Sequence, residues 1–424
     1  MINKKSIDVI KKATFSKMFI KPLYDSYCFS NIPQTIKNVL LNERHKALPA
    51  DILGDLPTSY DKVIVLLLDG FGWKFFNQHL AHSTFLQYIM NHGIISKLTT
   101  QFPSTTPAEI TTINTGLPVG RHGVYEWLYY EPQLDEIIAP LLFSFAGTRI
   151  RDTLIPTGID PQKLFPQQTV YNELKQNGVV SYAYIPREFA YSPYGDVVLS
   201  GANIVPYTTF PEALSHLSEM AINQKAKSYF YLYFGNIDRM GHLYGPDSQQ
   251  FNTEATATLH SLENIFLKHV QGKLSKTLFI ITADHGQAAI DPLKTIYLNK
   301  EFPQIKQWIK MNKEGSLIVP AGSCRDMFLH IKDEFIDEAV RHLQDFLEDK
   351  AEVYKVNDLV NKQIFGTDIS QIFLSRVGNV VILCRNNESV WWYEKDKFEI
   401  TYHGHHGGMT NDEMEIPFAC LPFL

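Results

Sequence analysis

Short, strongly apolar runs alternate along this chain with longer segments that have helical periodicity. The runs are rich in β-branched and aromatic residues and have the length of buried strands, at 63–68, 181–185, 229–234, 278–282, 327–331 and 380–384. Helices are expected at 211–222, 252–271 and 335–347, each with one apolar face. This alternation predicts an α/β fold with a mostly parallel central sheet flanked by helices. In such sheets, ligands bind beyond the carboxyl ends of the strands.

The segment 292–385 is predicted to be a smaller inserted α+β cap. It separates two stretches that carry polar motifs, and it has a strand–helix–strand pattern of its own. Residues 1–291 would then form the first part of a catalytic core, and residues 386–424 would complete it.

Composition excludes several classes of protein. A chain of 424 residues with 45% hydrophobic and 20% charged residues is typical of globular proteins rather than disordered ones. The net charge of −6 argues against a nucleic-acid coat or a polybasic membrane surface. Neither a signal-peptide core nor a membrane-spanning segment is recognised, so a cytoplasmic location is expected. The four cysteines form no CxxC pair and are expected to be reduced thiols: Cys28, Cys324, Cys384 and Cys420.

Two polar residues next to predicted elements are candidates for metal binding or catalysis. Asp69 ends the first apolar run and is followed by Gly70, which suits a metal ligand or a catalytic acid, although a helix N-cap is the alternative. Thr106 precedes Pro107 at an expected helix start, where the helix dipole favours a phosphate and a nucleophile that loses its proton. Taken alone, Thr106 is better explained as an N-cap.

Two later motifs combine carboxylates with imidazoles. Asp238 and His242 share one face if their turn enters a helix, which fits a divalent metal such as zinc but also an ion pair. Asp284, His285 and Gly286 directly follow the run 278–282, and such a turn is seldom needed for packing alone.

A histidine cluster near the end of the chain completes the set. His403, His405 and His406 lie among glycines, which allow close approach of the backbone to a ligand, and Glu413 follows. With one of these histidines, the motifs supply two sets of three nitrogen or oxygen ligands and one hydroxyl. Two divalent ions about 4 Å apart are the usual arrangement for in-line phosphoryl displacement.

The order of these motifs resembles the alkaline phosphatase superfamily, and within it the type I phosphodiesterase / nucleotide pyrophosphatase branch. The resemblance rests on strand–Asp69–Gly70, Pro103 to Thr106, Asp238 to His242 with Gly245-Pro246, Asp284-His285-Gly286 and His406-Gly407-Gly408. It implies an alkaline-phosphatase-like fold and a two-metal hydrolase of phosphate esters, most often with zinc and sometimes with manganese. The implied substrate is a small-molecule phosphate ester, with nucleotides among the candidates.

The resemblance also implies roles for single residues. Thr106, rather than Thr105, is the implied nucleophile and forms a phosphothreonine intermediate. The first implied metal site consists of Asp69, Thr106, Asp284 and His285. The second consists of Asp238, His242 and His406, with His405 as the second choice.

One position departs from the family pattern. Eukaryotic phosphodiesterases of this branch have Asn three residues after the nucleophile, where this chain has Glu109. A carboxylate there would repel phosphate unless it is protonated, points away or binds another cation. Glu109 and Tyr125 are the candidates for substrate binding. Core packing is the alternative for the aromatic residues Tyr125, Trp127, Tyr129 and Tyr130.

Other functions with the same ligands stay open. A phosphomonoesterase of the same superfamily and a metal-binding pseudoenzyme are the two main alternatives. The sulfatase motif is absent from the sequence, and a cofactor-independent phosphoglycerate mutase fits less well because its nucleophile is Ser.

Overall fold

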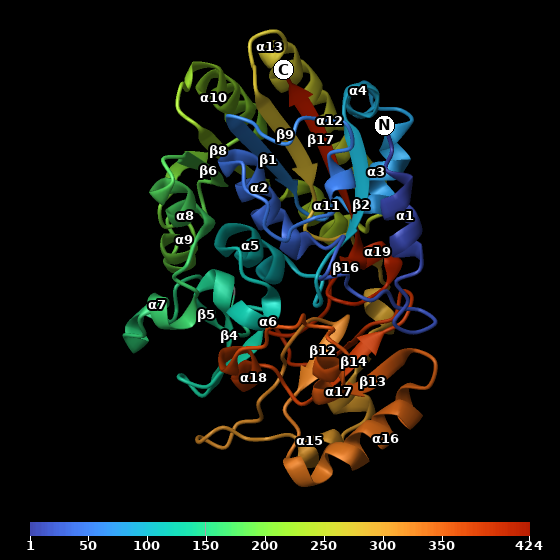
Figure 1. The fold of residues 1–424 in the computed structure, drawn as a ribbon. Helices are drawn as coiled ribbons and strands as arrows, with labels where there is room; N and C mark the ends of the chain where they lie inside the picture. Colours follow the sequence, from blue (N-terminus) through green and yellow to red (C-terminus); the bar gives the residue numbers. More distant parts are fainter. Residues whose placement is uncertain (149) are drawn as a thin grey trace.

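The computed structural model describes residues 1–148 and 150–424. A seven-stranded sheet lies at its centre, with the strand order β2-β17-β9-β1-β8-β6-β7 (Figure 1). Its strands are β1 (Lys62–Leu68), β2 (Ile94–Thr99), β6 (Val180–Pro186), β7 (Asn203–Tyr207), β8 (Ser228–Phe234), β9 (Thr277–Thr282) and β17 (Glu415–Phe423). Six of the seven strands run in one direction and only β17 is reversed, so the predicted mostly parallel sheet is confirmed.

The predicted strands are present within two residues of their expected bounds. They are apolar throughout because both faces are covered, as in β1, where every residue after Lys62 is buried. The sequence did not predict β2, β7 or β17. In β17, Pro417 and Pro422 pair with Lys97 and Leu278 inside the sheet, although proline is a signal against a central strand.

Helices pack in two groups on opposite faces of this sheet (Figure 1). One group contains α2 (Ile32–Leu41), α5 (Thr106–Thr115), α8 (Val170–Gln176) and α9 (Pro193–Val198). The other contains α3 (Trp73–Leu80), α4 (Thr84–His92), α10 (Phe210–Asn223) and α12 (Gln249–Ser261). The helix expected at 252–271 is α12, a π-helical stretch over Leu262–Leu267, and α13 (Lys268–Val270).

A second sheet lies beyond one end of the central sheet (Figure 1). Its antiparallel strands have the order β12-β14-β13, with bounds Asp326–Leu329, Val380–Cys384 and Ala351–Lys355. Helix α16 (Ile336–Leu347) packs against β13. A separate hydrophobic core, which includes Met327, Leu343 and Ile382, draws its residues from between Ile290 and Trp392. The insertion boundaries at 292 and 385 stay a prediction.

Shorter elements complete the fold. The remaining strands are β3 (Tyr129–Glu131), β4 (Glu136–Ala139), β5 (Ser144–Phe145), β10 (Ala288–Ala289), β11 (Ile296–Tyr297), β15 (Val390–Trp391) and β16 (Gly404–His405). The remaining helices are α1 (Lys4–Lys11), α6 (Val119–His122), α7 (Pro161–Leu164), α11 (Asn236–Tyr244), α14 (Leu298–Glu301), α15 (Ile305–Trp308), α17 (Val356–Asn361), α18 (Gln371–Arg376) and α19 (Asn411–Met414).

Two properties bear on the class of protein. Among the helices in the described residues, none combines the length and the apolar composition that crossing a membrane requires. All four cysteines are buried and free, in agreement with the expectation of thiols.

Candidate active site

The polar motifs converge at one edge of the central sheet. Strands β1, β8 and β9 are parallel, and their carboxyl ends lead into Asp69, helix α11 and Asp284. Strand β2 points the same way and leads toward Thr106, while antiparallel β17 starts at this edge, after the histidine cluster. The short pairing of β10 with β16 holds that cluster against the stretch after His285. Parallel topology thus gathers residues from 69 to 406 at one site.

The first group surrounds the ring of His285. Its Nε2 lies 3.1 Å from Thr106 Oγ1, 3.4 Å from Asp69 Oδ1 and 3.3 Å from Asp284 Oδ2. The three acidic and imidazole side chains are at most 3% exposed. Asp69, Asp284 and His285 each offer a ligand atom within 4.8 Å of the others, a spacing that fits a metal ion.

In the carboxylates of Asp69 and Asp284, one oxygen accepts hydrogen bonds from the protein and the other does not. Asp284 Oδ1 accepts the backbone N–H groups of Gly70 at 3.1 Å and His285 at 2.9 Å. Asp69 Oδ2 accepts the hydroxyl of Tyr233. Asp69 Oδ1 and Asp284 Oδ2 are buried and lack a hydrogen-bond partner among the described residues. A buried anionic oxygen without a donor is costly, so these two atoms fit metal coordination.

The second group is centred on Asp238, in the first turn of α11. His242 follows one helical turn later, with Nε2 3.2 Å from Asp238 Oδ2. His406 Nε2 lies 3.9 Å from Asp238 Oδ1. The set within 4.8 Å of one another is Asp238, His285 and His406, so His285 stands between the two groups. The ring of His406 stacks on that of His285 at 3.6 Å.

The rings of His242, His285 and His406 are oriented by the same kind of contact. Nδ1 of His242 lies 2.7 Å from the carbonyl oxygen of Gly404, Nδ1 of His285 3.0 Å from that of Gly286, and Nδ1 of His406 3.0 Å from that of Ser104. A carbonyl accepts only from N–H, so Nδ1 carries the proton and Nε2 has a free lone pair. Metal-binding histidines are oriented in this manner. Neither His242 nor His405 belongs to a set of potential ligands within 4.8 Å of one another. His242 still contacts Asp238, whereas the buried Nε2 of His405 has no partner among the described residues.

Without a cation, the carboxylates of Asp69, Asp238 and Asp284 would repel one another. Burial, followed by the charges of Asp284 and Asp238, raises the pKa of Asp69 well above its usual range. Burial also raises the pKa of Asp284. A divalent cation would supply the missing positive charge and keep the carboxylates ionised.

Close backbone packing brings the two groups together. Gly70 has φ of +70°, and a Cβ added there would lie 2.8 Å from Cα of Asp238. A larger residue at position 70 would separate Asp69 from Asp238, so the turn after β1 requires glycine.

Geometry distinguishes Thr106 from Thr105. Thr105 precedes α5 in an extended conformation, and its hydroxyl donates to the carbonyl oxygen of Tyr125 at 3.0 Å. Thr106 is the first residue of α5 and turns its hydroxyl toward His285. The structure therefore places Thr106 with the acidic cluster, and Thr105 away from it.

Glu109 and Tyr125, the two substrate-binding candidates, have their side chains in the core, which matches the alternatives of a carboxylate that points away and of core packing. The carboxylate of Glu109 turns back from α5 to Gln101, whose backbone N donates at 2.6 Å and whose Nε2 donates at 2.8 Å, and it also accepts from Thr100. Burial raises the pKa of Glu109 to about 8. Tyr125 is fully buried and stacks on Tyr129. Both side chains belong to the core behind the site.

Two supporting residues escaped the sequence reasoning. Gln287 Nε2 donates to the carbonyl oxygen of Asp238 at 3.0 Å and also to its carboxylate. Tyr233 holds Asp69, as described above. Gln287 directly follows Asp284-His285-Gly286 and could have been noted, whereas Tyr233 is one of several aromatic residues in β8 and gave no signal.

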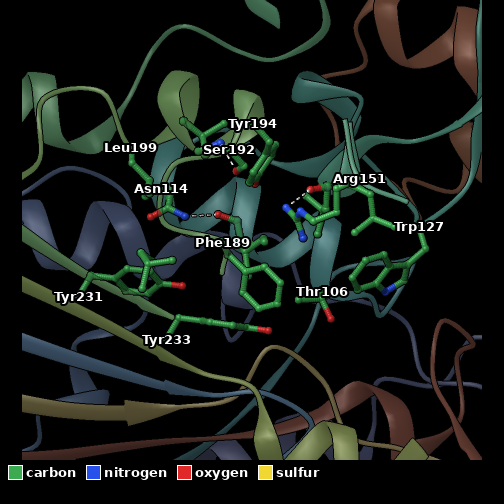
Figure 2. A pocket seen from close by; sticks show the side chains of 16 residues that line it. Thr106, Asn114, Trp127, Arg151, Phe189, Ser192, Tyr194, Leu199, Tyr231 and Tyr233 are labelled. Atoms are coloured by element: carbon green, nitrogen blue, oxygen red, sulfur yellow. Dashed lines mark hydrogen bonds between the residues drawn. The ribbon is translucent and has the colours of Figure 1, made fainter. Parts of the chain in front are cut away.

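Two hollows open beside the acidic cluster. One is a mostly apolar cavity of about 110 Å³ that is lined by Thr106, Trp127, Phe189 and Tyr233, among others (Figure 2). The other is a larger groove of about 940 Å³ with a mixed polar and apolar lining that includes Asp69 and Asp238. Trp127 borders both.

Comparisons with known proteins agree with this arrangement. A family model for type I phosphodiesterase / nucleotide pyrophosphatase matches residues 63–409. Human ectonucleotide pyrophosphatase/phosphodiesterase family member 5 is 21% identical over 381 residues, covering 89% of this chain and 72% of that protein.

Solved structures show the same fold. Murine ectonucleotide pyrophosphatase/phosphodiesterase 5 has a TM-score of 0.63 at 20% identity, covering 85% of this chain and 88% of that chain. A phosphonoacetate hydrolase from Sinorhizobium meliloti 1021, solved with phosphonoacetate, has a TM-score of 0.58 at 16% identity, covering 85% and 90%. The family match spans most of the chain and all the converging motifs. The chain therefore belongs to the type I phosphodiesterase / nucleotide pyrophosphatase family, in the alkaline phosphatase superfamily.

Proposed function

We propose that this protein is a metal-dependent phosphodiesterase or nucleotide pyrophosphatase that acts through a phosphothreonine at Thr106. The observation that carries the proposal is the position of the Thr106 hydroxyl, 3.1 Å from His285 Nε2 and beside two buried carboxylate oxygens without donors. This hydroxyl is well placed to become a nucleophile there.

The residues divide into two ligand sets. Asp69, Asp284, His285 and the Thr106 oxygen would hold one ion, and Asp238, His242 and His406 the other. Carboxylate and imidazole ligands fit zinc, with manganese as the second choice. When bound, the ions would neutralise the phosphoryl charge and lower the pKa of the threonine hydroxyl.

The protein's own groups then account for two displacement steps. The Thr106 oxygen attacks phosphorus, and the alcohol or nucleotide leaves on the opposite side. Water then attacks the phosphothreonine and releases the phosphate product with regeneration of the hydroxyl. The N-terminus of α5, where Thr106 lies, favours the negative charge that develops during both steps.

The relatives support a phosphate ester as substrate. A murine relative has been solved as an inactive variant in complex with AMP, so nucleotides belong among the first substrates to test. The cytoplasmic location expected from the sequence stays a prediction.

The test compares hydrolysis of bis-p-nitrophenyl phosphate and p-nitrophenyl phosphate by the wild type, Thr106→Val and Thr105→Val. Thr105→Val is the matched control because its hydroxyl contacts only a backbone carbonyl. We expect faster cleavage of the diester, loss of this cleavage on chelation and its return with zinc. Thr106→Val should lower kcat by about 10³-fold or more, because the nucleophile is absent.

Other results would redirect the assignment. A preference for the monoester would identify a phosphomonoesterase. Two bound metals without turnover of either substrate would favour the pseudoenzyme. Equal loss of activity in both threonine variants would contradict Thr106 as the nucleophile.

A further inference from the structure

The apolar cavity beside Thr106 contains an arginine that has no acidic partner among the described residues. The walls consist mainly of hydrocarbon and aromatic groups, such as Trp127, Leu142, Phe189 and Val198. Figure 2 shows Arg151 with Trp127 and Phe189 on the same cavity as Thr106. Its one hydrogen bond within the described residues is long, 3.4 Å from Nη2 to the carbonyl oxygen of Leu141.

The guanidinium of Arg151 also lies near an aromatic ring. Its guanidinium carbon lies 5.1 Å from the ring centroid of Phe189. No salt bridge joins Arg151 to any acidic side chain in residues 1–148 or 150–424. A guanidinium has five N–H donors, and most of them are unused here. Because a partly buried charge without a counter-ion is costly, this site is better satisfied by an anionic ligand.

The position of the cavity indicates which part of a diester would enter it. In-line displacement places the leaving group opposite the attacking oxygen. The cavity is lined by Thr106 and not by Asp69 or Asp238, whereas the groove is lined by both carboxylates and not by Thr106. Trp127, Phe189 and Tyr233 border the two hollows. The leaving group therefore fits the groove, and the substituent that stays on phosphorus fits the cavity.

The size of the cavity limits this substituent. A dry cavity of about 150 Å³ binds benzene, so this cavity of about 110 Å³ is filled by one small ring or a group of similar size. A neutral nucleoside would contact the apolar walls but leave Arg151 without a counter-charge. A quaternary ammonium group would be repelled.

We propose that Arg151 determines specificity by binding a negative charge on the retained substituent. The substrate class is a phosphodiester whose retained group is an apolar or aromatic body with a carboxylate or second phosphate. This inference rests on the proposed function, because it assigns the cavity to the retained group. Guanidinium is well suited to the task because its paired N–H groups match planar oxyanions.

Three matched diesters test the proposal. Each has p-nitrophenol as leaving group and a retained phenyl ring with a para carboxylate, carboxamide or trimethylammonium group. The wild type should prefer the carboxylate over the carboxamide by about 10- to 100-fold in kcat/KM, since hydrogen bonds to charged groups are the stronger ones. The trimethylammonium ester should be the poorest substrate. Most of the difference should be in KM, as for a binding contact.

Two substitutions then assign the preference to Arg151. Arg151→Met should reduce the spread among the three esters to about threefold, and Arg151→Glu should place the trimethylammonium ester first. Arg121→Met is the matched control, because Arg121 is exposed, pairs with Asp368 and lies outside the cavity lining. It should keep the wild-type order. A wild type that cleaves all three esters equally, or an Arg151→Met variant that still prefers the carboxylate, would overturn the proposal.

A binding measurement separates this proposal from the proposed function. Calorimetry on Thr106→Val with the three corresponding phenylphosphonates needs no turnover. We expect the carboxylate compound to bind most tightly and the trimethylammonium compound most weakly, and we expect this order to disappear in Thr106→Val/Arg151→Met. That result would support the Arg151 site even if no ester is hydrolysed. Equal affinities would contradict it even if diesters are cleaved.

Discussion

Replacing Glu109 by alanine should destabilise the protein without changing its substrate preference. The carboxylate accepts hydrogen bonds from the backbone N of Gln101, from Gln101 Nε2 and from Thr100. After truncation, Gln101 Nε2 keeps a second acceptor, Thr112 Oγ1 at 2.9 Å. The other two donors are buried and lose their acceptor. At about 1–3 kcal/mol for each, the free energy of unfolding should fall by about 2–6 kcal/mol.

The assay is equilibrium urea unfolding with zinc present, together with kcat and KM for bis-p-nitrophenyl phosphate. Glu109→Gln serves as the matched variant. Its amide keeps one acceptor oxygen for Gln101 N and Thr100, and it is neutral, as Glu109 is below its raised pKa of about 8. It brings an amide NH₂ close to Gln101 Nε2, so we expect a smaller loss of about 1–2 kcal/mol.

The kinetic measurements decide between a structural and a substrate-binding role. A structural Glu109 leaves KM of both folded variants within about threefold of the wild type. If Glu109→Ala kept the wild-type free energy of unfolding but changed KM tenfold or more, the carboxylate would have to contact substrate and the reasoning would be wrong.

Four further predictions follow from other contacts. Chelation should abolish hydrolysis and lower Tm, with both restored by zinc, because the buried carboxylates repel one another without a cation; a chelated protein with unchanged Tm and full activity would refute this. Gln287→Leu should weaken zinc binding or lower kcat by about 10- to 100-fold through loss of the hydrogen bonds to Asp238, measured by zinc titration and kinetics; unchanged values would show that Asp238 is held by other contacts. Burial raises the pKa of Glu126 to about 8, so the folded state retains a proton that the unfolded state loses above about pH 4.5. Stability from this group is therefore present at low pH and lost as pH rises toward 8, and Glu126→Gln should flatten that decline in urea unfolding; equal slopes would argue against a protonated Glu126. Arg325→Met should lower the free energy of unfolding by about 3–5 kcal/mol, because it removes the paired donors at 2.9 and 3.0 Å, and with them the charge partner, of the fully buried carboxylate of Glu413. A loss below about 1 kcal/mol would mean that the donors it keeps, Gly408 N and Thr410, are sufficient or that Glu413 takes up a proton.

Sequence reasoning succeeded where one local pattern determines the structure. Strands β1, β8 and β9 are covered on both faces and appear as uninterrupted apolar runs. Asp69 and the motifs at Asp238 and Asp284 follow such runs, so parallel topology was enough to predict that these three meet. The histidine cluster precedes β17, and His406 was assigned through the family resemblance. Strand β17 was missed because its prolines oppose the usual signal, although its neighbours on both sides stabilise it.

The parts that depend on tertiary packing could not be predicted. Glu109 is one helical turn after Thr106, which suggests the same face, yet its side chain finds donors in the segment before α5. Arg151 and Phe189 lie in separate loops, and only the folded chain brings them to the cavity beside Thr106. Loop positions of this kind leave no periodic signal in a sequence.

The stereochemical course at phosphorus tests the central claim most directly. A diester made chiral by a single sulfur on phosphorus is hydrolysed in heavy-oxygen water, and the configuration of the product is read by phosphorus NMR. Attack by Thr106 followed by attack by water inverts phosphorus twice, so the account predicts overall retention. Overall inversion would mean that water attacks the substrate directly, and that Thr106 does not form a covalent intermediate.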